Sequence, residues 1–99
     1  MNIIGDDHQR LLNRSIDEDT HIRSARYVRA DGIPILIEEW TWEAIHGFTA
    51  LFLVEHVATM DDAAIKTFLT EQGVDLGSAG VTIRCRDEYV FVNFGFFAN

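Results

Sequence analysis

The strongest constraint on the fold is a strict alternation of apolar and polar side chains over residues 81–86. Successive side chains of a strand point to opposite faces, so this run predicts a strand with one buried face. A turn at residues 87–88 then gives an antiparallel hairpin, whose register is set because a one-residue slip would separate its apolar residues. The predicted pairs are Cys85 with Val90, Ile83 with Val92, and Val81 with Phe94.

A second hairpin is predicted over residues 22–39. Two runs rich in β-branched and aromatic residues flank Asp31-Gly32, a dipeptide that favours the tight turns of hairpins. Pro34 has no N–H to give to a ladder, so its strand is expected at an edge of the sheet or only after this residue. The polar residues 15–21 are predicted to form a loop.

Residues 40–58 are predicted to form a helix between the hairpins. Apolar side chains occur nearly all round the helical projection from Ala44 to Ala58, which is typical of a central helix or of one shared with a partner subunit. Gly47 weakens this helix, and a buried strand at residues 51–54 is the alternative.

Two further helices are predicted. Residues 61–72 place apolar side chains at helical spacing, follow an acidic cap and end before Gly73, a natural terminator. Residues 6–14 form a short N-terminal helix, with Asp6 and Asp7 at its positive end.

These elements predict one α+β domain over residues 1–99, because strands and helices are segregated rather than alternating along the chain. Its antiparallel sheet is built from two β-hairpins packed against two central helices, with the short N-terminal helix outside. The approximate bounds are 22–39 and 81–97 for the hairpins, and 40–58 and 61–72 for the helices.

The composition excludes several classes of protein. Sixteen acidic and eight basic residues among 99 give a net charge of −8, which argues against nucleic-acid binding through a basic surface. A hydrophobic content of 47% is too high for a disordered chain. The single Cys85 cannot form an internal disulfide, and no signal-like or membrane-spanning run is present. We therefore expect a cytoplasmic protein, of bacterial or phage origin from its preference for arginine over lysine.

Glu43-x-x-His46 has the spacing of carboxylate-bridged metal sites, and Glu55-His56 follows on the same predicted helix. On a helix these side chains point in different directions, so no metal site is expected. The other patterns also predict neither a cofactor nor a catalytic residue. Ser78 lacks a nucleophile elbow, and the nearby glycines run from helix to strand, the reverse of a phosphate loop. Cys85 is predicted to be a structural thiol on the core face of its strand.

The other face of the terminal hairpin interleaves arginine with aromatic residues. Such a surface stacks bases in sheet-surface RNA binders, but the acidic charge of the chain opposes phosphate. The alternative is that helices cover the aromatics while the arginines lie at the rim. The residues are Arg84, Arg86, Tyr89, Phe91, Asn93 and Phe97.

The net charge is concentrated in residues 31–75, which contain nine acids and one base, whereas acids and bases balance in the rest of the chain. Carboxylates beside tryptophans are typical of a recognition surface in which aromatic anchors are surrounded by charges that attract a basic partner. A solubilising face is the alternative. The predicted partner-binding residues are Glu38, Glu39, Trp40, Trp42, Glu43, Asp61 and Asp62.

The function predicted from this surface is inhibition of a basic protein by occlusion, as in immunity proteins, antitoxins, phage-encoded anti-defence proteins and DNA mimics. The partner would be a toxin or a nucleic-acid-binding protein. A homo-oligomeric assembly subunit, dimerising through the apolar residues 44–58, is the second hypothesis. A small enzyme or metal-binding domain is the third.

Overall fold

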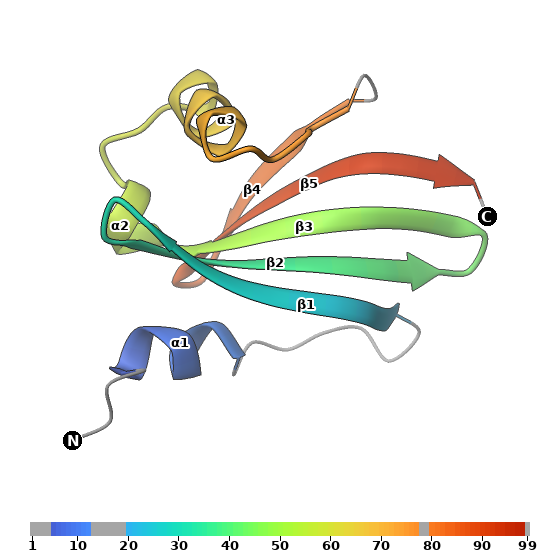
Figure 1. The fold of residues 1–99 in the computed structure, drawn as a ribbon, viewed down its shortest axis with the longest axis horizontal. Helices are drawn as coiled ribbons and strands as arrows, with labels where there is room; N and C mark the ends of the chain where they lie inside the picture. Colours follow the sequence, from blue (N-terminus) through green and yellow to red (C-terminus); the bar gives the residue numbers. More distant parts are fainter. Residues whose placement is uncertain (1–4, 13–19, 78–79, 99) are drawn as a thin grey trace.

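One five-stranded antiparallel sheet carries helices on both faces (Figure 1). The computed structural model describes residues 5–12, 20–77 and 80–98. In chain order the elements are α1 (Gly5–Leu12), β1 (Thr20–Ala30), β2 (Ile33–Trp42), β3 (Ile45–Leu53), α2 (Val54–Val57), α3 (Asp62–Glu71), β4 (Thr82–Arg86) and β5 (Tyr89–Ala98).

The strand order is β1-β2-β3-β5-β4, so β1 and β4 are the edges. Both predicted hairpins are present, and the α+β class is confirmed. The hairpins do not pair with each other, because β3 lies between them and pairs with β2 on one side and β5 on the other. The predicted sheet therefore lacked its central strand.

The predicted register of the terminal hairpin is confirmed for two pairs, Cys85 with Val90 and Ile83 with Val92. The third predicted pair, which involves Val81, lies beyond the β4–β5 ladder, since β4 begins at Thr82. In the first hairpin, Asp31 and Gly32 both have positive φ, at 52° and 78°. These are the angles of the tight turn that the dipeptide predicts.

Pro34 is accommodated in an interior strand, contrary to the expectation of an edge. It pairs with Arg29 of β1, but the β2–β3 ladder begins only at Leu36. The missing N–H of Pro34 therefore costs β3 no hydrogen bond, since a proline is tolerated where a strand starts. The edge strand of this hairpin is β1.

The predicted helix over residues 40–58 is wrong. Residues 40–42 end β2, residues 45–53 form β3, and only the four residues of α2 are helical. The buried-strand alternative was correct for residues 51–53. A central strand that is covered on both faces reads as an uninterrupted apolar run, which on a helical projection looks like a helix that is apolar all round.

The sheet separates two apolar layers. On the α1 face, Leu11 packs with Leu36, Leu51 and Leu53, and each of the four is at most 2% exposed. On the opposite face, Phe52 and its neighbours pack against α3 through three buried residues. These are Ile65, Phe68 and Leu69.

The predicted helix over 61–72 is confirmed as α3. The Asp61 side chain accepts a hydrogen bond from the Ala64 N–H at 2.8 Å, and Gly73 ends the helix with φ of +85°. The N-terminal helix is confirmed over residues 5–12, and residues 13–14 of the prediction lie outside the described residues. No helix in the described ranges is long and apolar enough to cross a membrane.

Candidate functional site

The seven residues predicted to bind a partner do not lie on one surface. Alternation along β2 places Glu38 on the α1 face, where it is only 6% exposed, and Glu39 on the opposite face. Glu43 lies in the β2–β3 turn, whereas Asp61 and Asp62 begin α3 at the other end of the sheet (Figure 1). The arrangement thus separates the tryptophans from the acids of α3.

The two predicted anchors, Trp40 and Trp42, share the α1 face of β2 near the β2–β3 turn. The Trp40 indole N–H donates to Thr49 Oγ1 at 2.8 Å, and the Thr49 hydroxyl donates to Asn93 Oδ1 at 2.6 Å. This chain of bonds crosses β2, β3 and β5 and fixes Trp40. Trp42 is 37% exposed and pairs with Ile45, which is 38% exposed.

A carboxylate–imidazole pair lies on the opposite face of the same end. Glu39 Oε2 is 2.6 Å from His46 Nε2, and the Ser24 hydroxyl donates to the other Glu39 oxygen at 3.3 Å. Nucleophilic catalysis needs the serine beside the imidazole, but here the carboxylate lies between them. The order of contacts therefore fits an ordered polar cluster rather than a catalytic triad.

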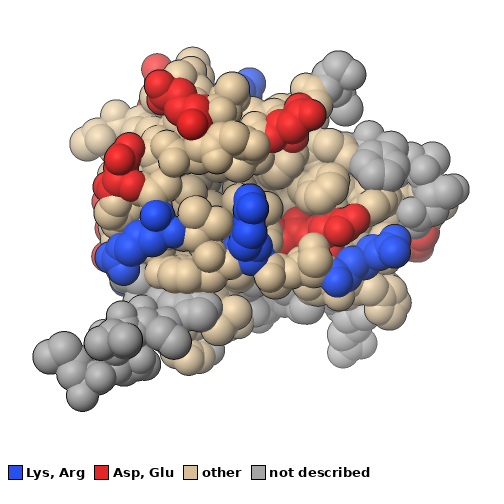
Figure 2. All heavy atoms as spheres, in the orientation of Figure 1, with Lys and Arg blue, Asp and Glu red and all other residues tan. Residues whose placement is uncertain are grey.

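The acids of residues 54–77 form what we call the acidic helical surface. It carries five exposed carboxylates and one exposed ammonium group, on Lys66. Figure 2 shows acidic side chains around the helical part of this face of the molecule, and further acidic groups over the strands to the right. The five acids are Glu55, Asp61, Asp62, Glu71 and Asp75.

The exposed arginines gather on the two edge strands instead. β1 carries three and β4 carries two, and neither strand contains an acid. In Figure 2 the basic groups form a row along the side of the molecule where Figure 1 places β1. The residues are Arg23, Arg26, Arg29, Arg84 and Arg86. Folding therefore converts the charge pattern of the sequence into an acidic helical layer and basic sheet edges.

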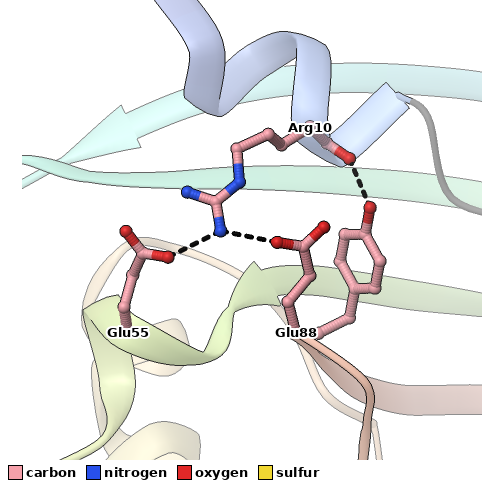
Figure 3. A network of polar contacts seen from close by, with 4 residues as sticks. Arg10, Glu55 and Glu88 are labelled. Carbon is pink, nitrogen blue, oxygen red and sulfur yellow. Dashed lines mark hydrogen bonds and ion pairs between the residues drawn. The ribbon is translucent and has the colours of Figure 1, made fainter.

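Arg10 is the exception, because it lies between two acids and ties α1 to the rest of the fold (Figure 3). Its Nη2 donates to Glu55 Oε1 at 2.6 Å and to Glu88 Oε2 at 2.7 Å. The Tyr89 hydroxyl donates to the Arg10 carbonyl at 2.7 Å. These bonds to Glu55 and Glu88 raise the pKa of Arg10, and the bond from Arg10 lowers the pKa of Glu55.

The metal-ligand pattern is not assembled by the fold. Glu43 and His46 lie at the β2–β3 end, whereas Glu55 and His56 lie in α2 at the opposite end. Among the described residues no group of three or more histidine, cysteine, aspartate or glutamate side chains could hold a metal ion.

The outer face of the terminal hairpin is partly covered. Tyr89 and Phe91 pack against the layer that contains Leu11 of α1, which supports the covered reading over a base-stacking surface. The Phe97 side chain lies outside the described side chains. Cys85 is exposed on the edge strand β4, contrary to the expected structural thiol in the core.

Comparison with protein-family models, curated proteins and solved structures finds no match for this chain. The function is therefore inferred from charge and geometry. Two features of that geometry have no local signal in the sequence: the Arg10 bridge, which joins residues 45 and 78 positions apart, and the placing of arginines at both sheet edges.

Proposed function

We propose that this chain is a non-catalytic protein that binds a basic surface of a partner protein and blocks it sterically. The observation that supports the proposal is the acidic helical surface, with five exposed carboxylates against one ammonium group. Asp61 and Asp62, two of the residues predicted from the sequence, belong to this surface. The tryptophan end of the sheet does not.

The separation of acidic and basic side chains gives the acidic helical surface an electric field of one sign. The exposed arginines lie on β1 and β4, so among the described residues only Lys66 and the Arg10 that pairs with Glu55 offset the field of the acidic helical surface. A field of one sign accelerates the approach of an oppositely charged partner and orients it. Carboxylates held in such an array can occupy the place of nucleic-acid phosphates on the partner.

Three of the five carboxylates, those of Glu55, Asp61 and Asp75, are also fixed in position by polar contacts. α3 is anchored by its buried side chains, Asp61 caps the helix, and the Asp75 carboxylate accepts the Gly77 N–H at 2.9 Å. A rigid array loses little conformational entropy on binding, so more of its attraction becomes affinity. Glu55 is held in the same way by Arg10.

The test is affinity capture from cells of the organism that encodes the chain, with captured proteins identified by mass spectrometry. The test variant, Asp62→Asn/Glu71→Gln/Asp75→Asn, removes three of the five carboxylates of the acidic helical surface and leaves the Asp61 cap intact. The control variant removes the same amount of charge from three turns of the sheet. This variant is Asp31→Asn/Glu43→Gln/Asp87→Asn. The three positions lie in the tight turns between strands, where φ is positive at 52°, 54° and 56°.

We expect a basic partner that the wild type and the control retain and the test variant loses by about tenfold or more in affinity. Association with the wild type should slow steeply as salt rises. An oligonucleotide that competes for the partner would identify its blocked surface as a nucleic-acid site. Binding that is insensitive to salt and equal for both variants would reject the proposal.

Self-association through the tryptophan end is the second candidate function. Trp42 and Ile45 are two of the three large hydrophobic side chains that are exposed among the described residues. Dimerisation through the whole apolar stretch 44–58, as predicted from the sequence, is no longer supported. Ala50–Leu53 are fully buried within one chain and cannot contact a partner. Light scattering should show a dimer that Trp42→Ala converts to a monomer. A wild-type monomer at high micromolar concentration would exclude this candidate.

A further inference from the structure

We propose that β1 is a docking strand for an extended, acidic segment of a partner protein, which adds a sixth strand to the sheet. This surface is separate from the acidic helical surface and does not depend on its function. Strand addition supplies main-chain hydrogen bonds from the exposed edge, while side chains of the added strand provide specificity.

β1 is the longer of the two edges. It spans eleven residues, compared with five for β4, and it pairs only with β2. The outer N–H and C=O groups of an edge strand form a template for another strand. A strand of about six residues is typical in folded proteins, so β1 is long enough to accept a complete one.

The arginines of β1 define the chemistry of the added strand. Alternation places Arg26 on the α3 face, where its partner is Ile37, and Arg29 on the α1 face, where its partner is Pro34. Arg23 lies at the irregularity in register between Ile22 and Ser24. A segment added to this edge would meet cations on both of its faces, and acidic residues at alternating or adjacent positions would pair with them.

These arginines are available for pairing. Arg23, Arg26 and Arg29 are all exposed, and in the part of the chain that the structure describes none of them forms an ion pair, although the protein has twice as many acids as bases. By contrast, Arg10 is held by two carboxylates. A second copy of the chain is a poorer occupant, because antiparallel pairing of two β1 strands would place six arginines along one seam.

The experiment measures binding of a synthetic peptide of about ten residues, with glutamate alternating with valine and both ends capped, by fluorescence anisotropy. We expect Arg23→Glu/Arg26→Glu/Arg29→Glu to weaken binding by about tenfold or more. The neutral variant Arg23→Gln/Arg26→Gln/Arg29→Gln should be intermediate, and it keeps the test valid where the glutamate variant fails to fold. The acidic-surface variant Asp62→Asn/Glu71→Gln/Asp75→Asn is the control and should bind at least as tightly as the wild type.

Two peptides with N-methyl groups at alternate residues separate strand addition from simple charge attraction. One should lose binding and the other retain it, because only every second N–H of an added strand faces the edge. Equal binding of both methylated peptides, or equal binding to wild type and the glutamate variant, would overturn the proposal. So would light scattering that shows a wild-type dimer which the glutamate variant dissolves, because a second copy would then occupy the edge.

Discussion

Gly95 and Phe48 lie in contact across the β3–β5 ladder, and the space beside the Phe48 ring admits no side chain at position 95. A Cβ built on Gly95 would be 2.9 Å from Phe48 Cδ2, and the φ of Gly95 is +66°. Phe48 in turn stacks on Phe94, with ring centroids 5.6 Å apart. This contact accompanies the irregularity in register between His46 and Phe48.

We expect Gly95→Ala to lower the free energy of unfolding by about 1–3 kcal/mol, because the new methyl group adds a clash to a strained backbone. Urea denaturation followed by tryptophan fluorescence measures this loss. Gly80→Ala is the control, since a Cβ at Gly80 would meet nothing within 4 Å. Equal stability of the two variants would show that the contact with Phe48 is not tight in solution.

Leu11 and Leu12 are neighbours in α1 with opposite environments, one with no exposed surface and the other 50% exposed. Leu11→Ala should cost about 2–5 kcal/mol of unfolding free energy, because it leaves a cavity against Leu36 and Leu51. Leu12→Ala should cost about 0.5 kcal/mol or less. Denaturant midpoints measure the difference. Similar losses for both variants would contradict the docking of α1 on the sheet.

Thr49 links Trp40 to Asn93 inside the sheet and is only 7% exposed. Thr49→Val preserves the shape but removes the acceptor for the indole N–H and the donor to the amide oxygen. We expect a loss of about 1–3 kcal/mol and a change in tryptophan emission. Thr67→Val on the exposed side of α3 is the control and should change stability by about 0.5 kcal/mol or less.

The Arg10–Glu55 pair makes stability depend on pH. Because Arg10 lowers the pKa of folded Glu55, the carboxylate binds protons less readily in the folded chain than in the unfolded chain. The stabilisation is complete above the unfolded pKa, about 4.3, and is lost as the pH falls through the lower folded value. Urea midpoints from pH 7 to pH 3 should show the stability advantage of wild type over Glu55→Gln shrinking with acid.

The same substitution in an Arg10→Gln chain is the control for this titration. Without the guanidinium the pH-dependent part of the difference between glutamate and glutamine at position 55 should shrink, because only burial and the charge of His56 still act on the pKa of Glu55. The effect is expected to be small, since the side chains of Arg10 and Glu55 are 31% and 52% exposed. A pH-dependent difference that persists at full size in the Arg10→Gln chain would assign it to another group.

Local patterns predicted what local physics determines. The Asp31-Gly32 turn, the pairing of Cys85 with Val90 and the Asp61 cap all depend on residues close in sequence, and all three are present. β3 was missed because both of its faces are covered, one by α1 from a distant part of the chain and the other by α3, which follows β3 closely. A strand with both faces buried loses the alternation that identifies strands at the surface.

The candidate site was less predictable for the same reason. The sequence showed which residues are charged but not which strands are edges, so it grouped Glu38 and Glu39 although the pleat of β2 places them on opposite faces. Counted along the sequence outside residues 31–75, the arginines are balanced by an equal number of acids. The fold nevertheless places Arg26 and Arg84 on the two opposite edges of the sheet, which the sequence count does not show. Asp61 and Asp62 were correctly predicted to lie at the start of a helix. They were wrongly grouped with the tryptophans, which lie at the other end of the sheet.

The position of β5 in the sheet has a consequence for biosynthesis. Of the five strands β5 comes last in sequence order, yet it lies between β3 and β4 in the sheet. A ribosome that has translated all but the last strand has therefore delivered a chain in which neither the β3–β5 nor the β4–β5 ladder can form. The core is therefore expected to be completed only after β5 has been synthesised, and a message truncated before Tyr89 should yield a product that proteases degrade rapidly.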